Sequence, residues 1–97
     1  MQFEWDEQKN TLNIQKHGID FSDAYELFGQ PLLVLKDERK DYKEHRYIGV
    51  GFIQQRLMVL VFTRPKKECV RLISLRKANK REQKKFKSAI QNQLGAD

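Results

Sequence analysis

A chain of 97 residues is the size of one domain, and its apolar residues, 39% of the total, form blocks that exclude a disordered protein. One cysteine excludes an internal disulfide, and the longest apolar run, from Leu57 to Phe62, is too short to cross a bilayer. The acidic N-terminus lacks the apolar segment of a signal peptide. These features predict a single soluble, cytoplasmic domain over residues 1–97 that makes no membrane contact.

The net charge of +6 comes from one segment of the sequence. Between Arg76 and Lys87 there are seven basic residues and one acid, Glu82, whereas 12 basic and 12 acidic residues balance elsewhere. A basic segment on a neutral body is typical of proteins that bind a polyanion or an acidic protein partner. A solvated helix face that only maintains solubility explains the run equally well when it is taken alone.

The predicted order of elements is two helices, four strands and one helix. The first helix begins after the N-cap residue Asp6 and ends at Gly18, and Phe3 and Trp5 are expected to anchor it. Its apolar residues are sparse. The second helix runs from about 22 to 28, has one apolar face, and ends at the Gly-Gln-Pro sequence of residues 29–31.

The middle of the chain predicts a sheet. Strands are expected over residues 32–35, 46–53, 57–63 and 68–75, with a charged loop over 37–43. The last three strands are joined by hairpin-length connections and should form an antiparallel meander. In the strand 46–53, Ile48, Val50 and Phe52 alternate with Tyr47, Gly49 and Gly51, so the two sets should face opposite sides.

The last helix is predicted to open at Asn79. Glu82 follows at the position that completes a capping box with Asn79. Apolar residues at helical spacing give the helix one stripe, which is expected to pack into the core: Phe86, Ala89, Ile90 and Leu94.

The sequence predicts no metal site, because His17, His45 and Cys69 do not have the spacing of metal ligands. No cofactor is predicted either. Glu44 and Arg46 are two residues apart, and the meander should place them at the same sheet edge as Arg64. Sequence phase does not place Arg76 there.

A carboxylate beside guanidinium groups suits cleavage of a phosphodiester, since the carboxylate takes the proton of a ribose 2′-hydroxyl and the cations stabilise the growing charge. A surface ion pair explains the pair of Glu44 and Arg46 as well. The basic pair Lys16-His17 ends the first helix, where interaction with the helix dipole is sufficient explanation when the pair is taken alone.

Four blocks, in their order and spacing, resemble the BrnT family of type II toxin–antitoxin toxins. They are Phe3-Glu4-Trp5-Asp6, Lys16-His17-Gly18, Glu44-x-Arg46 and Arg71-Leu72-Ile73-Ser74-x-Arg76-Lys77-Ala78. The resemblance implies an α+β, RelE-like fold: two N-terminal helices, a curved, mainly antiparallel four-stranded sheet and a C-terminal helix. It implies an endoribonuclease that inhibits translation by cutting RNA without a metal, leaving a 2′,3′-cyclic phosphate.

The resemblance also implies the roles of individual residues. His17, Glu44, Arg64 and Arg76 would be catalytic, with Glu44 as general base, His17 as general acid or phosphate ligand, and the two arginines stabilising the transition state. Lys16 and Arg46 would support RNA binding. The basic segment adds Lys77, Lys80 and Arg81 as candidate RNA-binding residues, although the final helix is outside the family's blocks and its lysines could equally contact RNA, the ribosome or the antitoxin. The expected partner is a BrnA-type antitoxin that forms a 2:2 heterotetramer with this chain. Operator DNA would be contacted only through the antitoxin. The competing interpretation is a module that binds nucleic acid or antitoxin without catalysis.

Overall fold

The structure is a computed structural model that describes residues 1–30, 32–38 and 44–95, except for the side chains of residues 90 and 92–95. The charged loop predicted over 37–43 therefore lies largely outside the described residues. In chain order the elements are β1 (Gln2–Glu4), α1 (Glu7–His17), the short 3-10 helix η1 (Phe21–Ala24), α2 (Tyr25–Phe28), β2 (Leu33–Lys36), β3 (Arg46–Ile53), β4 (Arg56–Lys66), β5 (Cys69–Lys77) and α3 (Lys80–Gly95).

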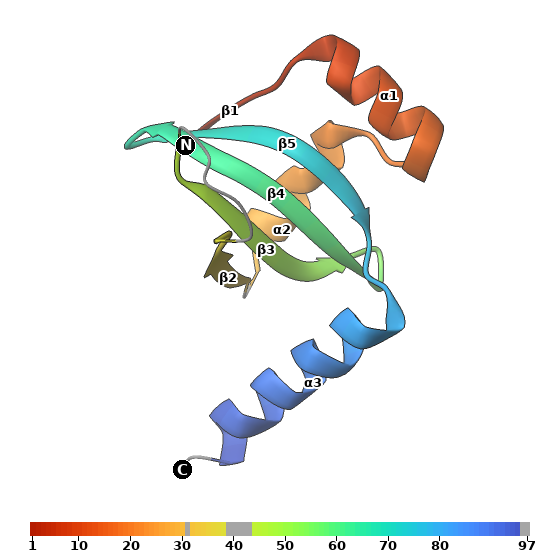
Figure 1. The fold of residues 1–97 in the computed structure, drawn as a ribbon, viewed down its shortest axis with the longest axis vertical. Helices are drawn as coiled ribbons and strands as arrows, with labels where there is room; N and C mark the ends of the chain where they lie inside the picture. The colour runs from red at the N-terminus through yellow and green to blue at the C-terminus, as the bar shows by residue number, and fades with distance from the viewer. Residues whose placement is uncertain (31, 39–43, 96–97) are drawn as a thin grey trace.

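The sheet has five strands in the order β1-β5-β4-β3-β2, where four were predicted (Figure 1). The missed strand is β1, which pairs in parallel with the start of β5, Phe3 opposite Val70. Three residues are too few to show an alternating pattern, and only tertiary pairing makes them a strand. An ion pair of 2.7 Å between Glu4 and Arg71 adds to this pairing. The sheet is consequently mixed, and the α+β class is as predicted.

The first helix has the predicted ends. The Asp6 carboxylate accepts hydrogen bonds from the backbone N–H groups of Gln8 and Lys9, at 2.8 and 3.4 Å. Gly18 ends the helix at φ 72°, in the left-handed region where a residue with a side chain is strained. Leu12 and Ile14 are exposed, so α1 does not attach to the body through its apolar side chains.

The second predicted helix is two shorter pieces, η1 followed directly by α2. Asp20 caps η1, because its carboxylate accepts from the N–H of Ser22 at 2.9 Å. Ala24 and Leu27 are buried and Phe28 is half-buried, which confirms the predicted apolar face.

The meander of β3, β4 and β5 is confirmed, and β3 has the predicted bounds. Strands β4 and β5 are longer than predicted, because the polar residues next to the turns also pair. The turn between β3 and β4 holds Gln54 and Gln55 at φ 49° and 68°, the left-handed conformation of the tightest hairpins.

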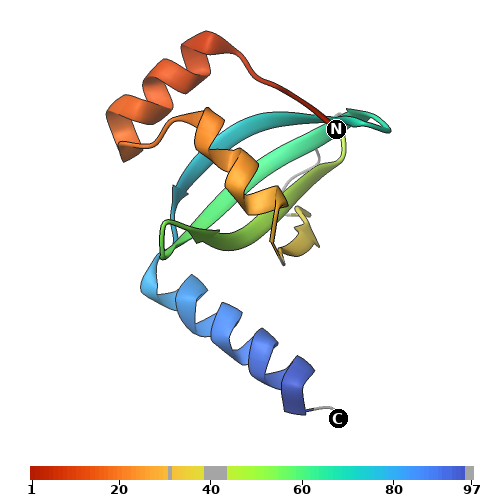
Figure 2. The same cartoon turned by 180° about the vertical axis from the view of Figure 1, so that it is seen from behind.

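The main core lies between the sheet and the layer formed by α1, η1 and α2, seen in front of the sheet in Figure 2. It includes Phe21, Leu27, Leu60 and Leu75, each fully buried, with Tyr47 packed against it. A second, smaller cluster occupies the opposite sheet face, where Val50, Val59, Ala78 and Phe86 meet, with Ile48 packed against them. The predicted alternation along β3 is confirmed, since Tyr47 and Ile48 belong to different clusters.

Helix α3 begins as predicted and then leaves the body. Asn79 and Glu82 form the capping box, each side chain accepting from the other's backbone N–H, at 2.8 and 2.9 Å. Phe86 is buried against the edge of Phe52, with ring centroids 5.7 Å apart. Beyond it the helix runs away from the sheet in both views (Figures 1 and 2). Of the predicted apolar stripe, Phe86 packs into the core and Ala89 is half-buried. The side chains of Ile90 and Leu94 lie outside the described ones.

Candidate active site

The predicted site residues lie in two groups. At one end of the sheet, the first residue of β3, Arg46, stands opposite Thr63 of β4, and its Nε lies 3.9 Å from the Glu44 carboxylate. Arg64 is the next residue of β4, so it shares this end, as predicted. It does not share the face, because Arg64 lines a hollow with Phe62 on the side covered by α2, whereas Arg46 follows the alternation of the opposite face.

The second group, which we call the His17 group, contains His17, Arg76, Lys16 and Lys77. It lies where the last turn of α1 meets the end of β5. The link is Asn13, one turn before His17 on α1. Its side chain donates to the Leu75 carbonyl at 2.8 Å and accepts from the Leu75 N–H at 3.1 Å.

Asn13 also donates to the carbonyl of Ile19, just after the helix, at 3.0 Å. The same buried side chain thus fixes the end of α1 to β5 and shapes the loop after it. Residues i and i+4 lie on the same side of a helix, so this attachment brings His17 to the end of β5, where the charge of Arg76 acts on it.

Arg76 is held by a carboxylate that the sequence analysis assigned only to helix capping. Its two terminal nitrogens donate to the two Glu82 oxygens at 2.8 and 2.7 Å, a bidentate pair in which both side chains are about 30% exposed. The Glu82 carboxylate therefore both caps α3 and orients Arg76. Strand β5 and helix α3 are joined at this point.

The environment of His17 favours the neutral imidazole. Partial burial, followed by the positive charges of Lys16 and Arg76, lowers the pKa of His17 from its ordinary value. An imidazole that is neutral at physiological pH can accept a proton, which is the requirement for a general base.

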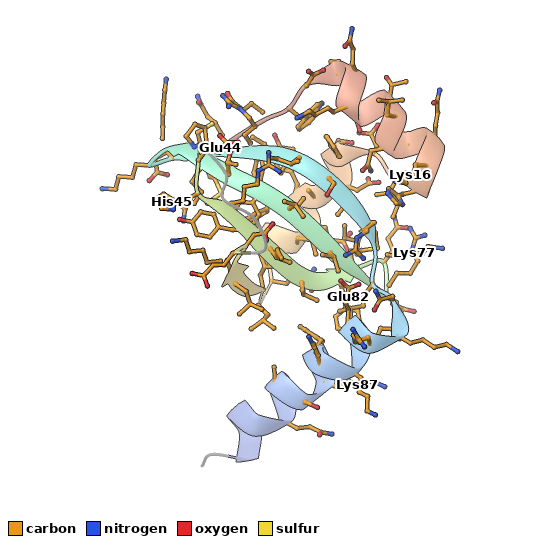
Figure 3. All side chains as sticks on the ribbon, in the orientation of Figure 1. Lys16, Glu44, His45, Lys77, Glu82 and Lys87 are labelled. Atoms are coloured by element: carbon orange, nitrogen blue, oxygen red, sulfur yellow. The ribbon has the colours of Figure 1, made fainter. Side chains whose placement is uncertain are left out.

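The other predicted RNA-binding cations surround this end of the molecule. Lys16 ends α1 and Lys77 ends β5, and both side chains are exposed. Lys80 and Arg81 follow in the first turn of α3 and are also exposed. Figure 3 shows Lys16 and Lys77 on one flank of the protein.

The two groups are separated along the sheet. Arg46 is opposite Thr63 and Arg76 is opposite Val59, four residues apart on β4. At 3.3 Å per residue the separation is about 13 Å. Figure 3 accordingly shows Glu44 at the far end of the sheet from Lys16 and Lys77. The structure therefore does not bring Glu44 into hydrogen-bonding reach of His17 or Arg76.

Comparison with known protein families gives one decisive match. The sequence model of "Ribonuclease toxin, BrnT, of type II toxin-antitoxin system" matches residues 5–82. The chain belongs to the BrnT family.

A solved structure agrees with the BrnT assignment. The 1.1 Å crystal structure of the Brucella abortus ribonuclease toxin BrnT is similar, with a TM-score of 0.67 and 29% sequence identity. The similarity covers 82% of this chain and 99% of that chain. A comparison with curated proteins found no match.

Two features of this BrnT-family site were missed by sequence analysis. Asn10 and Asn13 are buried, and their i, i+3 spacing in a helix poor in apolar residues was a signal that this polar face packs inward. Pairing of Glu82 with Arg76 had no comparable signal, because it depends on the angle at which α3 leaves β5.

Two absences characterise the described residues of this BrnT-family chain. No three His, Cys, Asp or Glu side chains come together in a group able to hold a metal ion. Among the same residues, no helix has the length and apolar character needed to span a membrane.

Proposed function

We propose that this BrnT-family chain is an endoribonuclease that cleaves RNA without a metal ion, and that the reaction takes place at the His17 group. The family supports the ribonuclease activity. The observation that carries the location is the contact region of α1 and β5, where an imidazole with a lowered pKa lies within the field of Arg76 and Lys16.

In the proposed reaction, neutral His17 removes the proton from the ribose 2′-hydroxyl. The 2′-oxygen attacks the adjacent phosphorus, the bond from phosphorus to the 5′-oxygen breaks, and that oxygen takes up a proton from water. The products are a 2′,3′-cyclic phosphate and a 5′-hydroxyl end. Arg76 and the ammonium groups of Lys16 and Lys77 stabilise the negative charge that grows on the phosphate.

The group at the other end of the sheet has a separate role in this proposal. Glu44 was expected to be the general base, but its ion-pair partner Arg46 lies about 13 Å along the sheet from Arg76. We assign Arg46 and Arg64 to binding RNA beyond the cleaved bond, and Glu44 to orienting Arg46 through their ion pair. A chain of nucleotides can span both groups, whereas a single phosphate cannot.

The deciding experiment is cleavage of a defined RNA in EDTA, with analysis of the product ends. We expect wild type to produce cyclic phosphate ends, His17→Ala to lose activity by at least about 100-fold, and Glu44→Ala to lose much less. His45→Ala is the matched control, because it removes the other histidine, which is exposed and has no assigned role.

Each alternative has its own result in this assay. If Glu44→Ala loses at least about 100-fold in activity and His17→Ala does not, the general base is Glu44 and the location proposed here is wrong. If wild type binds RNA but never cuts it, with or without translating ribosomes, the chain is a binding module and the enzymatic proposal fails. Cleavage that EDTA abolishes would contradict metal independence.

The proposed biological role is that of a toxin that inhibits translation in the cytoplasm and is neutralised by a BrnA-type antitoxin. Membership of a type II toxin family supports a protein antitoxin as partner. We expect the co-expressed pair to elute as a 2:2 complex in size-exclusion chromatography with light scattering, and to bind operator DNA only when the antitoxin is present. Operator binding by the toxin alone would contradict this assignment.

A further inference from the structure

One face of α3 carries a line of lysines, Lys80, Lys84 and Lys87, which we call the lysine stripe. At 3.6 residues per turn the three positions fall within about 60° of one another around the helix, over about 10 Å of its length. All three side chains are exposed. Buried Phe86 lies on the opposite side of the helix, against the sheet.

The lysine stripe opposes helix stability. Like charges at i, i+4 and i, i+3 repel, and cations in the first turn interact unfavourably with the positive end of the helix dipole. In the described part of the chain no ion pair joins the stripe to a carboxylate. Glu82, the acid of α3, is bound to Arg76. Solubility alone does not require this arrangement, because lysines at dispersed positions would provide it without the repulsion.

Helix α3 follows directly after the His17 group in the chain. The bidentate pair of Arg76 and Glu82 fixes the first turn of α3 at the end of β5, and the stripe runs along the side of the helix opposite Glu82. Figure 3 shows Lys16, Lys77 and Lys87 along the same flank, one on each of the three elements.

This part of the chain also lies at the border of the family match. That match ends at residue 82, so Lys84 and Lys87 lie outside the matched residues.

We propose that the lysine stripe binds the phosphate backbone of the RNA on one side of the cleaved bond. The inference rests on the proposed function, because it assumes that the polyanion is RNA. Flexible ammonium groups recognise phosphates as point charges, so the contacts should be independent of base sequence. The stripe then contributes affinity and leaves the chemical step unchanged.

The test compares two variants of equal net charge. One replaces the stripe (Lys80→Gln, Lys84→Gln, Lys87→Gln), and the control replaces three exposed lysines on other elements (Lys9→Gln, Lys66→Gln, Lys67→Gln). The probe is a single-stranded RNA whose 2′-oxygens are methylated, so that it binds without being cut. Its Kd is measured by anisotropy between 50 and 200 mM salt.

We expect the stripe variant to bind more weakly at 50 mM salt and to depend less on salt. Three lost phosphate contacts reduce the slope of log K against log salt by about 2, so the loss of affinity across this range becomes about 20-fold smaller. The control should keep the wild-type slope. Thermal unfolding should show no loss of stability in the stripe variant, since repulsion within α3 is removed. In cleavage of unmodified RNA, KM should rise and kcat stay unchanged.

Three results would overturn the inference. The first is an equal slope of log K against log salt in the stripe variant and the control, which would mean that overall charge and not the stripe determines binding. The second is poly-glutamate that displaces the methylated RNA from wild type as well as unlabelled RNA does, but no longer does so in the stripe variant. That result would mean that the surface recognises acidic protein. The third is a fall in the kcat of the stripe variant with KM unchanged, which would place the stripe in the chemical step. Failure of the proposed function looks different, because wild type would then bind the methylated RNA with the expected slope and leave unmodified RNA uncut.

Discussion

Asn13 determines where the imidazole of His17 lies. Its amide fills the position that a leucine or valine takes in most amphipathic helices, and it exchanges two hydrogen bonds with the backbone of Leu75. A buried polar side chain is costly unless its bonding groups are satisfied. This one forms three bonds, so it gives α1 one exact position on β5 where an apolar contact would tolerate sliding.

Asn13→Ala should therefore lower both stability and activity. The buried N–H of Leu75 loses its acceptor, which is expected to cost about 1–3 kcal/mol in the free energy of unfolding, measured in urea. The control is Gln15→Ala on the same helix, whose side chain is exposed and should change stability by less than about 0.5 kcal/mol. Full cleavage activity in a folded Asn13→Ala protein would contradict the positioning role.

Lys16 should set the pH range in which the enzyme works. Its charge contributes to lowering the pKa of His17. A general base acts when deprotonated, so kcat/KM should rise with pH through the pKa of His17, below the ordinary range of histidine. In Lys16→Gln that pKa should rise, and the ascending limb should move to higher pH. A pH–rate profile together with an NMR titration of His17 measures both values.

Lys9→Gln is the control for this shift, because it removes an equal charge from the other end of α1. Identical pH–rate profiles for Lys16→Gln and wild type would mean that the ascending limb reflects the titration of a group other than His17.

At the scale of the elements, sequence pattern predicted most of what local rules determine. Caps fixed both ends of α1, and alternation fixed β3 from its first residue to its last. The pattern failed where tertiary contacts decide, as in β1, whose three residues form a strand only because β5 lies beside them. It failed again for the attachment of α1, because Leu12 and Ile14 are exposed and asparagines provide the contacts.

Glu82→Gln tests the junction between β5 and α3. Glutamine keeps the length of the side chain and loses the charge, so Arg76 loses an ionic partner and the capping box is weakened. We expect a loss of about 1 kcal/mol in stability and faster hydrogen exchange in the first turns of α3. Ser88→Ala, exposed on the same helix, should change neither measurement. Unchanged exchange in Glu82→Gln would show that Phe86 alone holds the helix.

At the scale of the whole molecule, the site could be predicted only in part. Phase along a strand placed Glu44, Arg46 and Arg64 at one end of the sheet, as the structure has them. It could not reveal that Arg64 belongs to the other face, which depends on the register of β3 with β4. Nor could it reveal that Arg76 lies about 13 Å along the sheet from Arg46, which depends also on the register of β4 with β5. His17 joins Arg76 through a contact between residues 62 positions apart, which no local pattern encodes.

The architecture also predicts how stability is distributed. Phe86 is 7% exposed and packs on the sheet, so Phe86→Ala should cost about 3 kcal/mol in urea unfolding. Ending the chain after Lys87 should cost less than about 1 kcal/mol, since the second half of α3 runs away from the body (Figure 1). A truncated protein as unstable as Phe86→Ala would show that the far half of the helix packs against the domain.

The pairing of β1 with β5 has a consequence for the order of events during synthesis. The first strand of the chain has its partner almost 70 residues later, and α1 is fixed to the same late strand through Leu75. Neither the N-terminal edge of the sheet nor the junction of His17 with Arg76 can assemble before β5 has been made. A ribosome therefore carries a nascent chain whose proposed site is incomplete until β5 has been translated. The topology therefore makes the proposed ribonuclease activity depend on completion of β5.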